Sequence, residues 1–439
     1  MFVRALPRLY PTDRFFGVLG IAVVLSAAGY AYGVLYWAAL LLLVLLLGAT
    51  LRDAWLVVGG AAGAEGNRNT GAMLSVGDET RITIRLRNAS SRHLRGKILD
   101  ELPPELLHDS RELEVALPPG ESRLLSYPVR PTERGDYHFG RINLYLRSPL
   151  GLLDLRVILG EPQRVPAMPS IVQMKRLGKR VDTSLRTEGQ LRKRQVARSY
   201  AFDQIKEYVV GDDYRSINWR ATGRRNELMV NRYSEERAQR IYCVVDVGRS
   251  MRLPFNGLTL LDYAVNASLA LSNVIIKKRD RAGLLTFGEQ LGQVIAADNR
   301  PEQLGLIART LFNVRPKPLD SNYELLYYAG RRLLGGRSTI FLFTNFESPY
   351  SVERVLPSLR RLLKLHRVIV ILFENTEITD LLGGEEPDAE SIYYRAAARQ
   401  YLEERQLMVK SLRVQGIETV YTRPEDTGEA VVEAYLSGG

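Results

Sequence analysis

Hydrophobic and polar positions follow three different patterns along the 439-residue chain. Between Phe15 and Leu51 no residue is charged, and long uncharged runs are typical of membrane-spanning helices. Between Thr80 and Arg87 polar and apolar residues alternate, which predicts a strand with one buried face. From Arg240 onward, unbroken apolar runs alternate with segments of helical period. This last pattern predicts an α/β fold with a mostly parallel sheet.

The uncharged run is too long for a single membrane span. It holds 37 residues, whereas a helix crosses the hydrocarbon core with roughly 20. We therefore expect a membrane hairpin within an N-terminal segment 1–58, with helices at about 15–30 and 34–51. A cleaved signal peptide is the alternative, but its apolar region is normally less than half as long. The flanking residues are basic and predict that both ends stay in the cytoplasm: Arg4, Arg8, Arg14 and Arg52.

A β-domain is expected at 72–165, after a Gly- and Asn-rich linker at 59–71. Further strand candidates follow Thr80–Arg87 at short intervals, separated by turn residues, and this spacing is typical of an immunoglobulin-like sandwich. They are Lys97–Asp100, Glu112–Leu117, Arg123–Val129, Gly135–Phe139 and Ile142–Leu146. No chemistry is evident here, so we expect a spacer or interaction module.

The C-terminal domain, 240–439, is expected to be a doubly wound α/β fold. The predicted strands lie near 241–246, 282–287, 339–344, 368–373 and 418–422, with an antiparallel edge strand at Gln290–Ala296. The predicted helices lie near 260–277, 301–312, 322–334, 352–365, 390–414 and 427–436.

Composition and charge exclude several classes of protein. Cys243 is the only cysteine, so no disulfide framework forms within the chain. The four histidines are scattered, which argues against a zinc site. Of the net charge of +11, the segment 175–198 contributes +7, from nine basic and two acidic residues. It is either a solvated connector or a contact for anionic lipid or an acidic partner. Nucleic acid is not expected, because there is no reader motif and no ladder of stacking aromatics.

A longer motif lies between the β-domain and the α/β domain. It reads Gly211-Asp-Asp-Tyr-Arg-Ser-Ile-Asn-Trp219 and resembles the signature of a bacterial family catalogued as domain of unknown function number 58. The resemblance implies paired N-terminal spans, a von Willebrand A-like domain and work beside a MoxR-type AAA+ ATPase. The motif residues it marks are Gly211, Asp212, Asp213, Arg215 and Trp219, within a connector and signature segment 166–239.

The same motif residues have a plain structural interpretation. Gly211 permits a turn, Asp212 and Asp213 cap it or pair with nearby arginines, and Trp219 packs against the sheet. On this interpretation the segment packs against the α/β core. This structural role explains the motif at least as well as a binding site does.

The first α/β strand ends at Asp246, in an Asp-x-Gly-x-Ser turn that is similar to the adhesion-site loop of von Willebrand A domains. Carried over by position, the metal ligands are Asp246, Ser250, Ser321 and Asn345. Gly248 removes one hydroxyl, and Asn345 replaces a carboxylate. Since Mg²⁺ gives up water reluctantly, we expect a degenerate site that is weak or empty, with Mg²⁺ as the one possible cofactor. Alternatively, these polar groups hydrogen-bond one another.

No enzyme signature stands out. Gly330–Ser338 resembles a phosphate-binding loop, but Gly336 stands in place of the lysine and the segment joins a helix to a strand. We expect a non-enzymatic protein of the bacterial inner membrane, with cytoplasmic domains and a partner-binding edge at Asp246, Arg249 and Ser250. The alternatives are a metal-dependent adhesion or ligand-binding receptor, and a metal-dependent hydrolase that uses Asp246.

Overall fold

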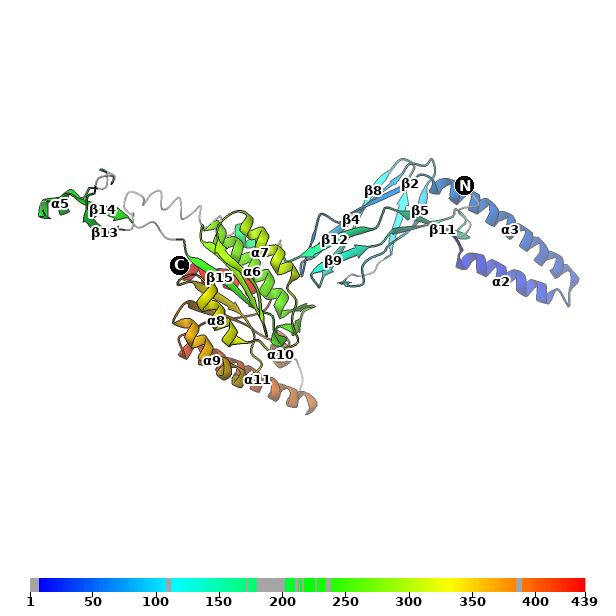
Figure 1. Cartoon of the computed structure of the whole chain (residues 1–439). Helices are drawn as coiled ribbons and strands as arrows, with labels where there is room; N and C mark the ends of the chain where they lie inside the picture. The colour runs from blue at the N-terminus through cyan, green and yellow to red at the C-terminus, as the bar shows by residue number, and fades with distance from the viewer. Residues whose placement is uncertain are drawn as a thin grey trace. The chain divides into compact units, whose positions relative to one another are not determined.

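The computed structural model describes two compact units, Met1–Met168 and Pro169–Gly439 (Figure 1). The described residues are 8–107, 112–170, 173–179, 202–209, 212, 214, 217–225, 227–233, 238–383 and 389–438.

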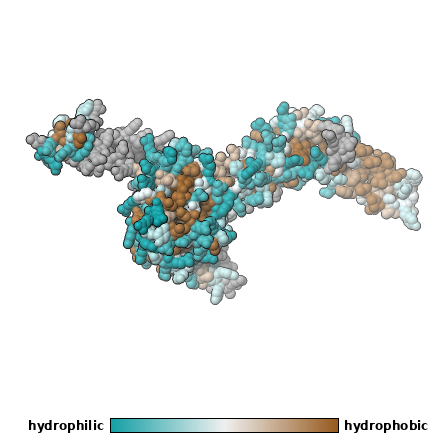
Figure 2. Space-filling model, in the orientation of Figure 1, coloured by the Kyte–Doolittle hydropathy of each residue, from teal (hydrophilic) through white to brown (hydrophobic). Residues whose placement is uncertain are grey.

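Two helices open the first unit, α2 (Asp13–Ala28) and α3 (Gly33–Ala61). Their surface is hydrophobic over most of its length (Figure 2). Within the described residues, α3 is the helix that is long and apolar enough to cross a membrane by length and composition. The 16 residues of α2 rise about 24 Å, which is less than the roughly 30 Å of a bilayer core.

The predicted end of the second helix, at residue 51, is wrong by ten residues. The helix continues through Asp53 to Ala61. The Asp53 carboxylate is fully buried and accepts hydrogen bonds from the backbone N–H groups of Leu150 (3.1 Å) and Leu152 (3.4 Å). A distant turn thus satisfies this charge, which local sequence gives no means of foreseeing.

Antiparallel strands make up the rest of the first unit. A five-stranded sheet has the order β1-β11-β10-β5-β7, a four-stranded sheet β2-β4-β8-β6, and a three-stranded sheet β3-β12-β9, in which only the β3–β12 pair is parallel. The strands are β1 (Leu9–Pro11), β2 (Ala64–Asn69), β3 (Leu74–Ser75), β4 (Thr80–Asn88), β5 (Leu94–Asp100), β6 (Leu106–Leu107), β7 (Leu113–Leu117), β8 (Ser122–Pro131), β9 (Gly135–Phe139), β10 (Ile142–Arg147), β11 (Leu153–Leu159) and β12 (Gln163–Met168).

The core of this sandwich is apolar and takes in the end of α3. Ile84 and Leu86 from one sheet pack with Ile98 and Leu144 from the other, and Val57 of α3 joins them. The six strands expected from alternation are present, because their apolar positions form these inner faces. The linker expected at 59–71 is wrong, since Ala64–Asn69 pairs with β4 as strand β2.

The described part of the second unit begins with helical residues at 173–179 and continues with a β-hairpin. This hairpin consists of β13 (Phe202–Glu207) and β14 (Met229–Tyr233), paired antiparallel, with the short helix α5 (Trp219–Arg225) between them. The end of the motif joins this hairpin, because Ile217 forms a bridge with Val230.

The α/β part of the second unit is a six-stranded sheet of order β19-β18-β15-β20-β21-β22. All neighbours are parallel except β19, which is antiparallel to β18 as the sequence predicted. The strands are β15 (Arg240–Asp246), β18 (Arg281–Phe287), β19 (Leu291–Asp298), β20 (Thr339–Phe343), β21 (Arg367–Phe373) and β22 (Glu418–Thr422). A 3-10 turn η3 (Arg249–Arg252) and the small strands β16 (Pro254–Phe255) and β17 (Leu258–Thr259) follow β15.

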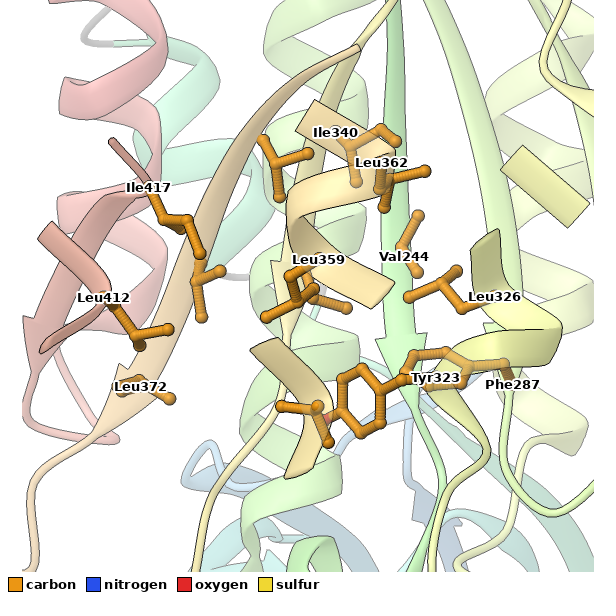
Figure 3. Packing of buried hydrophobic residues seen from close by; sticks show 14 of the residues in the cluster. Val244, Phe287, Tyr323, Leu326, Ile340, Leu359, Leu362, Leu372, Leu412 and Ile417 are labelled. Carbon is orange, nitrogen blue, oxygen red and sulfur yellow. The ribbon is translucent and has the colours of Figure 1, made fainter. Parts of the chain in front are cut away.

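Helices connect these strands and cover both faces of the sheet. They are α6 (Leu260–Lys277), α7 (Glu302–Asn313), α8 (Tyr323–Leu333), α9 (Pro349–Leu363), α10 (Thr376–Gly383), α11 (Ala389–Val414) and α12 (Thr427–Ser437). Side chains of α8 and α9, among them Leu326 and Leu362, lie beside Val244 and Ile340 of the central strands (Figure 3). Leu412 of α11 lies beside Leu372 of β21 in the same buried cluster. The expected α/β architecture is confirmed as a mixed, mostly parallel sheet, because continuous apolar runs such as Ile241–Val245 require cover on both faces.

Candidate functional site

The candidate site lies where the strand order reverses, between β15 and β20. Successive connections leave these two central strands in opposite directions, so the carboxyl ends of the strands bound a crevice there. The structure brings Asp246, Ser250, Ser321 and Asn345 together around one small cleft of about 100 Å³. The sequence-based grouping of these four residues is therefore spatially correct.

Asp246 lies at the base of the cleft and is almost completely buried, with 1% of its surface exposed. Its Oδ1 accepts hydrogen bonds from the Gly248 N–H (2.8 Å) and from the Ser321 hydroxyl. Its Oδ2 accepts from the Thr344 hydroxyl (2.6 Å) and from the Tyr323 hydroxyl (3.2 Å). Burial raises the pKa of this carboxyl, and the four donors oppose that rise. Both oxygens are thus engaged by the protein itself.

Tyr323 and Thr344 form the inner wall of this network. Their hydroxyls are 2.5 Å apart, and the Tyr323 ring packs edge-on against Phe287. Burial and the nearby Asp246 carboxylate raise the pKa of Tyr323. Neither residue was among those predicted from the sequence, although Thr344 directly precedes the predicted ligand Asn345 and Tyr323 follows the predicted ligand Ser321 by two positions.

Gly248 leaves room for Ser321. A Cβ atom at position 248 would lie 2.3 Å from Ser321 Oγ and 3.1 Å from Asp246 Oδ1. The backbone there has an ordinary φ of −72°, so the glycine is required by space and not by conformation. The missing hydroxyl of the adhesion-site pattern is therefore replaced by a direct contact between Ser321 and Asp246.

The Asn345 side chain is held by the buried guanidinium of Arg405. The Arg405 guanidinium donates from Nη1 to Asn345 Oδ1 (3.1 Å) and to the Phe346 carbonyl. Arg405 belongs to α11, is 6% exposed and lies over the Tyr401 ring at 4.9 Å. Arg405 was not among the residues predicted from the sequence, because it lies 60 residues from Asn345 in the chain.

The polar groups around the cleft differ from the set of oxygen ligands that a hard cation requires. Mg²⁺ needs near-octahedral coordination by oxygen atoms, but the carboxylate oxygens of Asp246 already accept four hydrogen bonds. The Asn345 amide oxygen likewise already accepts a hydrogen bond from the Arg405 guanidinium. Among the described residues, no cluster of three or more His, Cys, Asp or Glu side chains is placed to hold a metal ion.

The mouth of the cleft carries a network of alternating charges. Arg249 Nη2 lies 2.9 Å from Glu347 Oε2, and its Nε lies 3.5 Å from Asp320 Oδ1. Arg354 Nη2 lies 3.2 Å from the other Asp320 oxygen. Tyr350 stands beside them and is 73% exposed. This surface, which we call the rim, is formed by Arg249, Asp320, Glu347, Tyr350 and Arg354.

The signature motif is described in part. Asp212 caps the turn by accepting from the Val209 N–H (3.0 Å) and pairs with Lys206 at 2.8 Å. Trp219 is 70% exposed at the start of α5, so the expectation that it packs against the sheet is wrong; α5 has no buried residue to anchor it. Gly211, Asp213 and Arg215 lie outside the described residues, as does most of the basic segment 175–198.

Comparisons with known proteins agree with the resemblance in the sequence. A family model described as "Protein of unknown function DUF58" matches residues 204–381. The uncharacterized protein YeaD of Bacillus subtilis (strain 168) is 19% identical over 225 residues, which are 49% of this chain and 54% of that protein. The chain thus spans about half the length of this curated relative.

Several solved structures share local similarity. Trypsin-activated alpha-2-macroglobulin from Escherichia coli is 17% identical with a TM-score of 0.21, over 24% of this chain and 7% of that chain. The ASH/PapD-like domain of human CEP192 is 13% identical with a TM-score of 0.19, over 25% and 87%. The CARDB domain of the PF1109 protein from Pyrococcus furiosus is 15% identical with a TM-score of 0.16, over 22% and 93%.

Proposed function

The chain carries a DUF58 family domain at residues 204–381, and on this premise we propose that it is a membrane-anchored interaction protein without catalytic activity of its own. The observation that carries the proposal is the Asp246 network. A general base or metal ligand must offer a free oxygen to the reacting group, and the oxygens of Asp246 are held by four donors of the protein.

In this proposal the α/β unit is von Willebrand A-like and works without metal. The strand order of its sheet and the Asp246 turn support the first part. The contact of Ser321 with Asp246 and the guanidinium on Asn345 support the second. The β-sandwich is an immunoglobulin-like spacer or interaction module.

The rim is the docking surface for a protein partner, and the resemblance in the sequence points to a MoxR-type AAA+ ATPase. Exposed Arg and Tyr side chains at the centre of a patch are typical of residues that dominate binding energy, and the rim presents Arg249, Arg354 and Tyr350. Since Arg249 is already paired with Glu347 and Asp320, an acidic group of the partner would exchange with these carboxylates.

Reversing one charge at the rim tests this. We expect Arg249→Glu to weaken binding of the co-purifying ATPase by at least about tenfold, measured by surface plasmon resonance on the full chain in detergent. Arg360→Glu is the matched control, because Arg360 is an exposed arginine in the last turn of α9, at the end away from the rim. Wild-type affinity of the Arg249→Glu variant, together with loss of binding on reversal of charges in 175–198, would move the docking surface to that basic segment.

The anchor is the helix pair, and we propose that both helices span the bacterial inner membrane as a hairpin, with the bilayer thinned locally around the shorter α2. Length and apolar composition of α3 support one span. Arg8, Arg14 and Arg52 near the helix ends favour cytoplasmic soluble units. Anionic lipid contact by 175–198 belongs to the same proposal.

Topology separates this function from that of an outward-facing adhesion receptor. A cytoplasm-active reporter fused after Gly439 is expected to be active, and an export-active reporter at the same position silent. The reverse pattern would contradict the ATPase partner and favour the receptor.

A further inference from the structure

A second cavity, of about 660 Å³, lies in the first unit where the helices meet the sandwich. Four arginines line it: Arg14 of α2, Arg92 and Arg95 of the β4–β5 region, and Arg147 of β10. Leu56 and Leu94 give it an apolar side. Its volume is within the usual range for binding sites of small molecules.

Most of this positive charge is uncompensated. Arg147 pairs with Asp154 at 3.1 Å. Within the described part of the chain, no carboxylate lies within 4.0 Å of the guanidinium groups of Arg14, Arg92 or Arg95. The acidic Asp53 of α3 is buried and bonded to the backbone of the neighbouring turn. Three of the four arginines that line the cavity therefore have no ion-pair partner among the described residues.

Two glycines leave the space that the guanidinium groups of Arg92 and Arg14 occupy. A Cβ at Gly59 would lie 3.0 Å from Arg92 Nη1, and one at Gly151, whose φ is +74°, would lie 3.1 Å from Arg14 Nη1. Arg92 is further held by donating to the Leu56 carbonyl (2.7 Å) and by stacking over Trp55 at 5.3 Å. Because its side chain is already ordered, little conformational entropy is lost when it binds an anion.

The cavity lies next to the ends of the apolar helices. Leu56 follows the end of the uncharged run, Leu51, by five residues, which is about 8 Å along a helix. Arg14 directly precedes the start of that run. The headgroup layer on each side of a bilayer is roughly 5–8 Å thick, so a chain anchored through α3 holds this cavity at headgroup level.

We propose that this cavity binds the phosphate-bearing headgroup of an anionic phospholipid, a proposal that rests on the proposed membrane anchoring. Arg14, Arg92 and Arg95 contact the phosphate oxygens, for which the guanidinium fork is suited. Leu56 and Leu94 contact the glycerol backbone and the first methylenes. The apolar side and the neighbouring span favour a lipid over free phosphate, since basic pockets beside membrane helices suit lipid headgroups.

Native mass spectrometry of the delipidated full chain in detergent tests the proposal. Phosphatidylglycerol and phosphatidylcholine are titrated separately, and we expect wild type to bind one phosphatidylglycerol preferentially. Arg14→Gln combined with Arg95→Gln is expected to reduce that preference by roughly tenfold or more. Neither side chain makes a hydrogen bond or ion pair within the described residues, so this variant should fold. Arg92→Gln gives an independent second variant.

A matched control variant removes two arginine charges outside the cavity. Arg81→Gln with Arg85→Gln alters two exposed arginines of β4 outside the cavity, and should leave the preference unchanged. An equal loss in this control, an unchanged preference in the cavity variants, or a wild type without preference would each overturn the proposal. So would displacement of the lipid by inorganic phosphate at similar concentration, because the cavity would then be a soluble-anion site.

Membrane association distinguishes the two levels of the proposal. The same chains are extracted from native membranes with alkaline carbonate. Retention in the membrane without a headgroup preference leaves the anchor in place and rejects the lipid site. Release into the supernatant rejects the anchor itself, and the lipid site with it.

Discussion

Asp246→Ala is expected to destabilise the α/β unit by about 2–4 kcal/mol, because a buried donor that loses its acceptor costs roughly 1–3 kcal/mol. Four donors lose their acceptor in this variant: the Gly248 N–H and the hydroxyls of Ser321, Tyr323 and Thr344. The expected loss is less than the sum of four penalties. The Tyr323 and Thr344 hydroxyls already contact each other at 2.5 Å and can satisfy each other in part.

The measurement is thermal unfolding of the full chain in detergent, with hydrogen–deuterium exchange of the β15 amides to locate the change. Asp320→Ala is the matched control, since Asp320 lies on the same cleft but its side chain is 52% exposed. Exposed ion pairs contribute about 0–1 kcal/mol, so this control should stay close to wild type. Equal stability of the Asp246→Ala and Asp320→Ala variants would show that the network does not hold the site together.

Gly248→Ser is expected to destabilise the protein by about 1–3 kcal/mol without creating a magnesium site. The new Cβ would lie 2.3 Å from Ser321 Oγ, so Ser321 must rotate away from Asp246 and lose its hydrogen bond. The hydroxyl of the adhesion-site pattern is then restored, but the Asn345 amide oxygen still accepts from Arg405. Calorimetric titration with Mg²⁺ should show no tight binding in wild type or variant.

A double-mutant cycle with Ser321→Ala isolates the steric contact. If the collision causes the loss, the stability costs of Gly248→Ser and Ser321→Ala will be strongly non-additive, because the second change removes the colliding oxygen. If the two stability costs are additive, the destabilisation by Gly248→Ser does not come from the collision with Ser321. A low-micromolar dissociation constant for Mg²⁺ in wild type would contradict the metal-free site and restore the adhesion receptor as a candidate.

The order of elements followed from the sequence because it depends on local periodicity. Apolar runs such as Ile241–Val245 have to be covered on both faces, and the alternation in Thr80–Arg87 needs one buried face. Turn residues then marked where one strand ends and the next begins in the sandwich and in the α/β domain. The edge strand Leu291–Asp298 was predicted in the same way. The grouping of Asp246, Ser321 and Asn345 also followed, because the carboxyl ends of parallel strands meet at one edge.

Contacts between residues far apart in the chain were decided only by the tertiary structure. The extension of α3 through Asp53 depends on backbone N–H groups at Leu150 and Leu152, 97 and 99 residues away. Arg405 reaches Asn345 from α11, and Arg14, Arg92 and Arg147 meet at one cavity from three separate elements. A buried or clustered charge is tolerated only where such partners or solvent are supplied, and their supply is set by packing. Sequence periodicity therefore determined which elements form, whereas tertiary packing determined which charges find a partner within the protein.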